Sequence, residues 1–391
     1  MPIVQTCATL EVQVLNVSPT ITLFLPSLEG GGAQRVFVEL ANEFVALGLR
    51  VNLALASAHG PYLEEVCADV RVIDFGASGV LQSLPRLARH LRLERPDALL
   101  SGLDHTNIIA ILARGASGNC TRCVVSMRSV PSAVYRETRS VRRWLLLQLM
   151  KVAYPFADAI VANSEAVALD LAQLLHFRRG KLHTVYNPLN VSRIDKWSRE
   201  QVDHPWCAAG GPKVILSVGS LTPLKDFPTL IRAFSIVRAA RDCRLVILGE
   251  GAERANLERV VRELGLQRDV LLAGFVSNPF AWMRHADVFV SSSITEGCPN
   301  ALMQALACGI PVISTDCAGG SSELLQDGKW GRLIAVGDYR AMATAIAMTL
   351  EAAIHPDVTQ RAKDFAHDRI ARQYLRILLP NLTLPSMGQQ S

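Results

Sequence analysis

Several features are missing from this 391-residue chain, and each absence argues against a class of protein. The first eighteen residues contain no Lys or Arg, so the charged start of a secretory signal peptide is lacking. No apolar run reaches the eighteen or more residues that a membrane-spanning helix needs. We therefore expect a protein that is neither exported nor membrane-spanning, with residues 1–18 as a poorly ordered N-terminal extension.

The chain also lacks the patterns of a metal site and of a nucleic-acid interface. Its nine cysteines are odd in number and dispersed, which favours free thiols in a reducing cytoplasm. Cys120 and Cys123 have the spacing of half a zinc site, but no second pair or histidine cluster accompanies them. The net charge of +5 is modest, and no recognition helix or stacking-aromatic motif accompanies it. We predict neither a metal cofactor nor a nucleic-acid partner.

The composition and the order of the apolar runs predict two α/β domains. Half of the residues are hydrophobic and 19% are charged, a composition typical of globular proteins. At 391 residues the chain is too long for a single ordinary hydrophobic core. Short apolar runs alternate with helical patterns throughout, a rhythm typical of parallel sheets wrapped by helices. The polar, Pro- and Gly-bearing stretch from Val191 to Pro212 is the predicted connection between the domains.

A glycine-rich turn follows the first predicted strand. The apolar run from Ile21 leads into Gly30, Gly31 and Gly32, and a helix comes next. Three glycines remove side chains where backbone approaches something closely, and the helix N-terminus offers free N–H groups to an anion. The spacing is not that of the dinucleotide fingerprint. A flexible turn without a ligand is the alternative.

Polar side chains follow two further strands of the first half. Asp104 and His105 come just after the apolar run that begins at Ala98, and Arg128 comes just after the run that begins at Cys123. In a doubly wound sheet these positions face the same crevice. The alternative for His105 is an ordinary residue at the start of a helix.

The second half repeats the alternation of predicted strands and helices and carries more charged residues at its turns. Lys225 lies just ahead of a predicted helix, where the helix dipole disfavours a cation, so we expect an anionic ligand shared by the two. A surface lysine in a turn is the alternative. From Val288 to Leu325 the chain is predicted as strand, turn, helix, strand and turn, with Glu296 in the first turn. We expect the chemistry in this stretch.

The segment from Tyr135 to Tyr154 interleaves basic and large apolar residues. A basic helix with Trp and Leu on its other face can lie in the headgroup region of an anionic membrane. An ordinary helix that faces the core and has a solvated basic side is the alternative. A second basic cluster, formed by Arg86, Arg89, His90, Arg92 and Arg95, modestly favours the membrane. The residues of the first segment are Arg136, Arg139, Arg142, Arg143 and Lys151, with Trp144, Leu145, Leu146, Leu147, Leu149 and Met150.

Together, these motifs resemble those of the retaining glycosyltransferases of family 4, which have the GT-B fold. The resemblance covers the chain from about Ile21 to Leu378 and implies two Rossmann-like α/β domains that face a central cleft. It implies an acceptor-side domain at residues 19–195 and a nucleotide-sugar domain at 196–365. Residues 366–391 would form a tail and a helix that crosses back to the first domain. The motifs are Gly219 to Lys225, Leu248 to Arg254, Gly274-Phe275 with Asn278-Pro279, Glu296 to Val312, Gly30 to Gln34, and Asn187-Pro188.

The resemblance also implies roles for individual residues. Lys225 would neutralise the nucleotide diphosphate, Glu296 would bind donor-sugar hydroxyls, and His105 would lie near the sugar and the acceptor. The remaining donor contacts would be made by the glycine loop, Arg128, Ser220, backbone at Val276, Asn300 and Ala301, and by Gln304 at the ribose. No metal is required, because Lys225 and helix N-termini replace it.

Two positions depart from the family pattern. Ser220 stands where an arginine is common, and Gln304 stands where the family has a second carboxylate. Glutamine still accepts a ribose hydrogen bond, whereas the missing arginine removes a bidentate diphosphate contact. Arg128 is predicted to supply compensating charge.

The expected activity is transfer of a sugar from a nucleotide sugar, UDP-linked, with retention of configuration. The expected acceptor is a lipid-linked oligosaccharide or a surface polysaccharide, and the expected location is cytoplasmic, with peripheral contact at the inner membrane face. Two alternatives stay open. One is a non-catalytic protein that binds nucleotide sugars, favoured by Ser220 and Gln304, and the other is a nucleotide-sugar epimerase, for which clustered acid/base carboxylates beyond Glu296 are missing.

Overall fold

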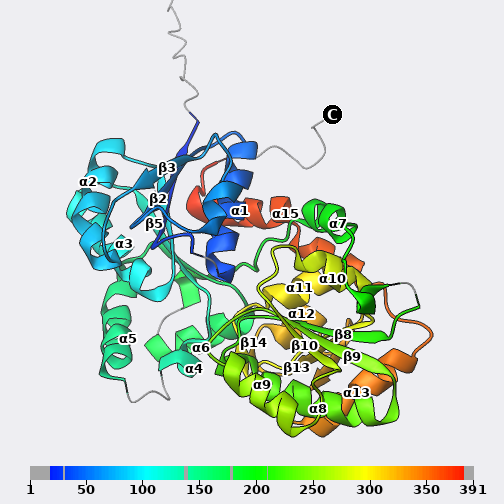
Figure 1. The fold of residues 1–391 in the computed structure, drawn as a ribbon. Coiled ribbons are helices and arrows are strands. Elements are labelled where there is room, and N and C mark those ends of the chain that lie inside the picture. The colour runs from blue at the N-terminus through cyan, green and yellow to red at the C-terminus, as the bar shows by residue number, and fades with distance from the viewer. Residues whose placement is uncertain (1–17, 30, 136–139, 177–178, 209, 383–391) are drawn as a thin grey trace, which may run out of the picture.

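The computed structural model describes residues 18–29, 31–135, 140–176, 179–208 and 210–382. Two parallel sheets, each wrapped by helices, lie side by side (Figure 1). The predicted N-terminal extension, apart from residue 18, lies outside the described residues.

The first sheet has seven parallel strands in the order β3-β2-β1-β4-β5-β6-β7. Its inner strands are almost continuous apolar runs, because helices cover both faces. The strands are β1 (Thr20–Leu25), β2 (Arg50–Leu55), β3 (Arg71–Asp74), β4 (Ala98–Gly102), β5 (Arg122–Met127), β6 (Ala159–Ala162) and β7 (Leu182–Thr184). The helices are α1 (Gly32–Ala46), α2 (Leu84–Glu94), α3 (Asp104–Ser117), α4 (Pro131–Tyr135), α5 (Val141–Ala153) and α6 (Glu165–Leu175), with short 3-10 turns at Pro61–Glu65 (η1), Val80–Ser83, Tyr154–Phe156 and Arg179–Lys181.

The second sheet has six parallel strands in the order β10-β9-β8-β11-β13-β15. They are β8 (Lys213–Val218), β9 (Cys243–Leu248), β10 (Val270–Gly274), β11 (Val288–Ser291), β13 (Val312–Thr315) and β15 (Arg332–Ile334). Two short strands, β12 (Thr295–Glu296) and β14 (Ala318–Gly319), pair beside it. The helices are α8 (Phe227–Ala240), α9 (Arg254–Glu263), α10 (Pro279–His285), α11 (Asn300–Ala307), α12 (Ser321–Leu325), α13 (Tyr339–Glu351) and α14 (Thr359–Ala362), with 3-10 turns at Pro205–Cys207, Pro223–Lys225 (η6) and Lys363–Phe365.

The two sheets share one winding order. In each, the first strand (β1 or β8) lies between the second strand and the fourth (β4 or β11), so the direction of winding reverses there. Ligand crevices of open parallel sheets form at this switch point, beyond the carboxyl ends of the strands. The predicted fold class, two Rossmann-like α/β units, is confirmed.

Two helices connect the halves. Helix α7 (Val191–Ser198) begins inside the stretch predicted as a polar connection, and it packs on α10 and α11 of the second half. Helix α15 (His367–Leu378) returns to the first half and packs on α1, β4 and β5 (Figure 1). The domain boundaries at residues 195/196 and 365/366 stay predictions.

Candidate active site

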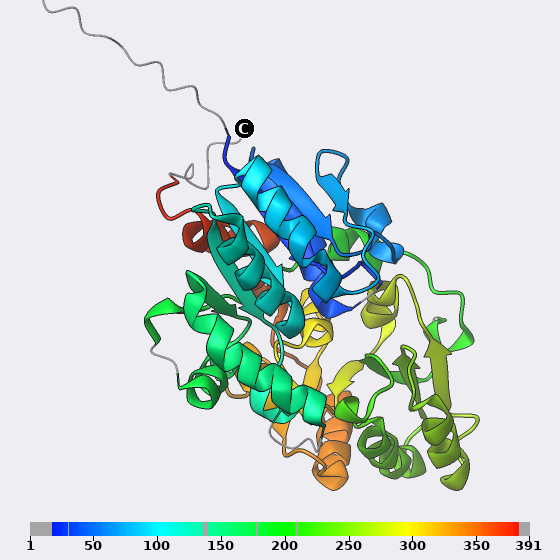
Figure 2. The same ribbon diagram turned by 90° about the vertical axis from the view of Figure 1, so that its left-hand side faces the viewer.

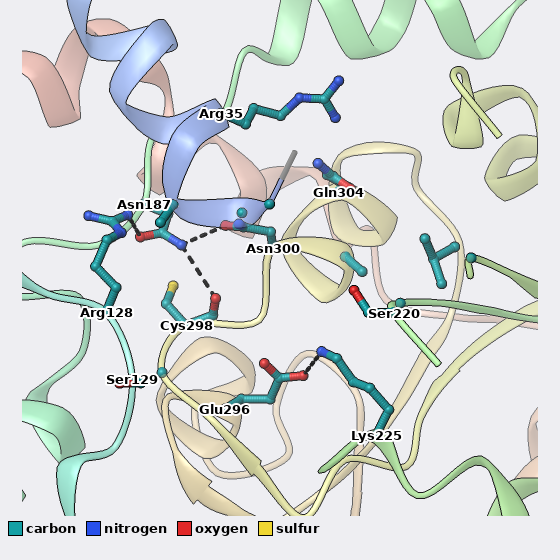
Figure 3. A pocket seen from close by; sticks show the side chains of 18 of the residues that line it. Arg35, Arg128, Ser129, Asn187, Ser220, Lys225, Glu296, Cys298, Asn300 and Gln304 are labelled. Carbon is teal, nitrogen blue, oxygen red and sulfur yellow. Dashed lines mark hydrogen bonds and ion pairs between the residues drawn. The ribbon is translucent and has the colours of Figure 1, made fainter. Parts of the chain in front are cut away.

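A cavity of about 660 Å³ lies between the two halves. Loops at the carboxyl ends of both sheets line it (Figure 3). Of the predicted site residues, Gly30 lies outside the described part of the chain. The structure brings all the others together as lining residues: Gly31, Gly32, His105, Arg128, Ser220, Lys225, Val276, Glu296, Asn300, Ala301 and Gln304.

An ion pair between Lys225 and Glu296 forms one wall of the cavity (Figure 3). Lys225 ends the η6 turn after β8, and Glu296 lies in β12 after β11, so the pair joins the two loops at the switch point. Ser293 Oγ donates to Glu296 Oε1 at 2.8 Å, and Ser292 Oγ donates to the backbone carbonyl of Lys225 at 2.7 Å. The side chains of Lys225 and Glu296 are only 26% and 13% exposed. Partial burial strengthens their attraction relative to a surface pair.

The backbone of Glu296 is held by a close glycine contact. Gly319 of β14 has φ 126°, a conformation that side chains rarely adopt, and a Cβ there would lie 1.4 Å from the carbonyl oxygen of Glu296. Only glycine permits this approach of the two short strands. The carboxylate of Glu296 is therefore presented by rigid backbone.

The N-terminus of α11 meets the first half of the chain. Asn187, which follows β7, donates from Nδ2 to Oδ1 of Asn300 at 2.6 Å and to the carbonyl oxygen of Cys298 at 3.3 Å. A Cβ on Gly32 would lie 2.6 Å from Asn300 Nδ2, so the glycine-rich loop lies directly against the side chain at the start of this helix. The glycine loop and the free N–H groups of α11 thus face the same space, which suits an anionic group.

Arg128 is anchored by neutral partners. Its guanidinium donates to Ser126 Oγ at 3.1 Å, to the Tyr374 hydroxyl at 3.2 Å and to Asn187 Oδ1 (Figure 3). These contacts position the charge without neutralising it. The compensating role predicted for Arg128 stays a prediction.

His105 and Asp104 lie at the start of α3, beyond a strained residue. Leu103 has φ 77°, a left-handed conformation that is unfavourable for a leucine. Asp104 accepts a hydrogen bond from the Tyr135 hydroxyl, and burial raises the pKa of this carboxyl. Burial lowers the pKa of His105, and Arg142 of α5 lowers it further against the opposing pull of Asp104. His105 lines the cavity as a neutral imidazole near pH 7.

Several lining residues were not singled out from the sequence. Glu250, Arg35 and Tyr62 come from separate loops and from α1, whereas Ser293, which is not a lining residue, donates to Glu296. The sequence could have indicated Ser293, because this residue lies just after the strand that begins at Val288. Arg35 and Tyr62 follow no strand end, and only the packing of α1 against η1 brings them together.

The basic segment forms helix α5 from Val141 onward, while Arg136 and Arg139 lie outside the described residues. Leu147 and Met150 face the core, whereas Trp144 and Leu145 are 58% and 51% exposed. One apolar side of this helix packs on the core, as the second alternative predicts, and another apolar side faces outward; contact with a membrane stays a prediction. In the second basic cluster His90 is buried, and it shares a hydrogen bond with Thr22 Oγ1 at 3.1 Å. It is not a surface charge.

The comparisons with known proteins agree with this architecture. Residues 30–193 match the family model described as Glycosyltransferase Family 4, and residues 212–352 match the model described as Glycosyl transferases group 1. A Campylobacter jejuni relative is 32% identical over 375 residues, which cover 91% of this chain and 98% of the relative. The chain belongs to the family 4 glycosyltransferases. That relative is the N-acetylgalactosamine-N,N'-diacetylbacillosaminyl-diphospho-undecaprenol 4-alpha-N-acetylgalactosaminyltransferase.

Other relatives of this glycosyltransferase and solved structures extend the likeness. The lipopolysaccharide core biosynthesis glycosyltransferase LpsE of Rhizobium meliloti is 26% identical, over 89% of this chain and 96% of the relative. The crystal structure of Anabaena HepE in complex with UDP and glucose superposes with a TM-score of 0.76 at 20% identity, over 93% of this chain and 99% of HepE. A glycosyltransferase from Rickettsia africae gives a TM-score of 0.74 at 17% identity, over 93% of this chain and 100% of that structure. These structures establish the GT-B fold.

Proposed function

We propose that this glycosyltransferase moves a hexose or N-acetylhexosamine from a UDP-linked donor to a diphospho-polyprenyl-linked oligosaccharide or a surface polysaccharide, with retention of anomeric configuration. The observation that carries the proposal is the Lys225–Glu296 ion pair, which lies in a cavity shared with the N-terminus of α11. A departing diphosphate needs fixed positive charge, and sugar hydroxyls need a fixed acceptor. This pair supplies both within one wall.

The contacts of Glu296 support a retaining mechanism without a covalent sugar–enzyme intermediate. The cavity carboxylate best placed for a sugar, Glu296, is already bound by Lys225 and Ser293, so it is a poor nucleophile. We propose front-side attack by the acceptor hydroxyl, with the departing phosphate as the proton acceptor. His105, Lys225 and backbone N–H groups then contribute positioning and charge stabilisation, and no metal is required.

The acceptor is proposed from the outer surface of the first half. Val141, Leu145, Leu149 and Val152 repeat at helical spacing along α5 and are 45% to 78% exposed, and Phe156 continues the stripe. Helix α5 lies at the outside of the molecule (Figures 1 and 2). Arg142 and Arg143 are exposed beside the stripe. An apolar stripe flanked by arginines suits the surface of an anionic membrane.

The position of α5 favours a membrane-held acceptor. Helix α5 packs on α3, whose first residues Asp104 and His105 line the cavity, and the charge of Arg142 in the first turn of α5 lowers the pKa of His105. A lipid-linked acceptor held at α5 would therefore lie near the reacting sugar. The relative from Campylobacter jejuni carries diphospho-undecaprenol in its printed name, which supports the same class of acceptor. No helix among residues 18–29, 31–135, 140–176, 179–208 and 210–382 is long and apolar enough to cross a membrane.

A donor panel tests the proposal. The purified protein is incubated with UDP-, GDP-, dTDP- and ADP-sugars, slow donor hydrolysis is measured, and proton NMR assigns the anomer that first appears. We expect UDP-sugar turnover with retention. Inversion, or turnover of another nucleotide sugar alone, would contradict the donor or the stereochemistry. Sedimentation with anionic and neutral liposomes tests α5, and the variant Leu145→Glu with Leu149→Glu is expected to abolish the binding.

One observation favours a second candidate. Ser220 and Gln304 both line the cavity, so neither an arginine nor a second carboxylate is present at these two positions. A protein that binds nucleotide sugars without turnover would have the same architecture. Calorimetry that detects UDP binding, with no hydrolysis or transfer for any donor, would identify this candidate.

A further inference from the structure

We propose that Arg35 of α1 is a ligand of the nucleotide diphosphate, in addition to Lys225 of the second half. This inference rests on the proposed nucleotide-sugar donor. Arg35 lies in the first turn of α1, and its side chain lines the central cavity. It also lines a smaller cavity of about 20 Å³ that adjoins the first one, together with Asn300 and Gln304. Figure 3 shows its guanidinium extending from α1 above Gln304.

The charges in the cavity leave a diphosphate short of partners. Among the described lining residues, the arginines and lysines are Arg35, Arg128 and Lys225. Lys225 is paired with Glu296. Arg128 is held by the neutral side chains of Ser126, Tyr374 and Asn187, and it lies away from Arg35 in Figure 3. A nucleotide diphosphate carries more negative charge than one paired lysine can offset. A further cation on the side of α11 would add to the partners of the diphosphate.

Arg35 is the cation that can be released. Its Nη2 pairs with Glu65 Oε1 at 3.3 Å, but the other oxygen of Glu65 accepts a shorter bond from Arg193 Nη1, at 2.6 Å. When Arg35 turns to a phosphate, Arg193 still neutralises Glu65. The Nε of Arg35 is buried and has no hydrogen-bond partner among the described residues, so this group gains a bond rather than exchanging one.

The surroundings of Arg35 keep its positive charge available. Burial raises the pKa of Glu39, one turn along α1, to about 7, with Arg35 and Arg193 opposing the rise. Two arginines therefore face one ionised carboxylate, Glu65, below that pH. Gln304, on the other side of Arg35, is uncharged. The ring of Tyr62 lies 5.1 Å from the guanidinium carbon and supports the side chain without competing for its donors.

Arg193 is a matched control. It pairs with the same carboxylate and lines the smaller cavity, but it is absent from the lining of the central one. A loss caused by disturbing the Glu65 cluster would therefore appear in both Arg35→Gln and Arg193→Gln. A loss caused by a missing phosphate contact would appear in Arg35→Gln alone.

Calorimetry with UDP, UMP and uridine tests the assignment. For Arg35→Gln we expect UDP affinity to fall by about ten- to a hundredfold, as for a lost charge-assisted bond, and uridine affinity to change less than about twofold. Arg193→Gln is expected to weaken UDP binding by at most about threefold. Arg35→Lys keeps the positive charge but loses the paired N–H donors of the guanidinium, so we expect an intermediate affinity for UDP. This variant also tests the proposal should Arg35→Gln fail to fold.

The outcomes separate the two proposals. UDP binding by the wild type with an unchanged affinity in Arg35→Gln would overturn the role of Arg35 alone. Equal losses in Arg35→Gln and Arg193→Gln for all three ligands would also overturn it, in favour of a structural role. Geranyl diphosphate is measured in parallel as a probe of the acceptor. If Arg35→Gln loses affinity for geranyl diphosphate but not for UDP, Arg35 is assigned to the acceptor and the nucleotide assignment is overturned. No binding of any nucleoside diphosphate by the wild type would overturn the proposed donor itself.

Discussion

The two halves of this glycosyltransferase share one strand order but carry different ionisable groups at their switch points. In the second half, Lys225 and Glu296 face each other as an ion pair across the switch point. In the first half, burial disfavours the charged forms of the groups at the equivalent switch point, lowering the pKa of His105 and raising that of Asp104. The same topology therefore carries an ion pair at one switch point and two desolvated groups at the other.

The difference is explained by which loops are buried and what they pair with. Lys225 and Glu296 form a direct ion pair, and Ser293 adds a hydrogen bond to the carboxylate of Glu296 while Ser292 bonds the backbone of Lys225. Asp104 has a tyrosine rather than a cation as its hydrogen-bond partner, so desolvation dominates its pKa. In the proposed reaction, the Lys225–Glu296 pair serves the leaving diphosphate and the donor-sugar hydroxyls, and His105 lies on the side of the acceptor.

The largest expected effect comes from breaking the ion pair between Lys225 and Glu296. Lys225→Ala removes the cation and leaves Glu296 partly buried without its partner. We expect kcat for donor turnover to fall by about 10²- to 10³-fold, equivalent to about 3–4 kcal/mol, as for loss of one preorganised electrostatic contact. Steady-state kinetics measure this. Lys213→Ala, which removes an exposed pair with Asp287, is the control and should leave kcat unchanged. Wild-type turnover by Lys225→Ala would refute the comparison.

The next effect concerns Glu39 in α1 of the first half and depends on pH. Glu39 has a folded-state pKa of about 7 against 4.5 in the unfolded chain. Between these values the folded protein keeps a proton that the unfolded chain has lost, so the free energy of unfolding falls as pH rises from 4.5 to 7 and is level above. Relative to Glu39→Gln, we expect the wild type to lose at most about 3 kcal/mol across this window.

Urea unfolding at pH 5, 6, 7 and 8 measures the effect of Glu39. Glu64→Gln, which changes an exposed carboxylate of η1, is the control and should keep the pH dependence of the wild type. If Glu39→Gln and the wild type show parallel pH profiles, Glu39 is ionised throughout and the first half is more charged than the comparison holds.

A smaller effect is expected from Tyr135→Phe. The change removes the hydroxyl that donates to Asp104, and with it a support of the strained turn at Leu103 that presents His105. We expect kcat to fall about tenfold, or about 1.4 kcal/mol, with donor KM changed less than about twofold. Tyr154→Phe is the control, because its hydroxyl accepts from Asn107 in the same buried region. It should lower stability without lowering kcat. Equal kcat losses would mean a general packing effect.

The smallest effect concerns a contact between the halves, away from the cavity. The carboxylate of Glu323 in α12 accepts from the backbone N–H groups of Glu165 and Ala166, at 2.9 and 2.6 Å, and so caps α6 of the first half. The Tyr186 hydroxyl donates to it at 3.0 Å. We expect Glu323→Gln to lower the free energy of unfolding by about 1 kcal/mol, because an amide cannot accept all three bonds.

Urea unfolding of Glu323→Gln is compared with that of Glu351→Gln, which breaks an exposed pair with Arg241 and should have almost no effect. An unchanged stability in Glu323→Gln would show that this contact between the halves contributes little. A change in kcat alone would mean that it acts on closure rather than on stability.

The sequence predicted the fold class because its signals are local. Apolar runs that alternate with helical patterns, and turns with Gly31, Gly32, Lys225 and Glu296 after them, place the site at strand ends without knowledge of the packing. The outward side of α5 was left open, because spacing alone does not say which apolar side packs on the core. Only its packing on α3 and α4 separates Leu147 from the exposed Leu145.

The sequence by itself determined two parallel α/β units, their order along the chain and the loops that line the cleft, since these depend on periodicity and on turn residues close together in the chain. Only the tertiary structure decided which charges survive there. Glu65 pairs with both Arg35 and Arg193 across 30 and 128 residues of chain, and Tyr135 reaches Asp104 across 31. The charge of a partly buried group depends on such distant partners and on the water that packing excludes.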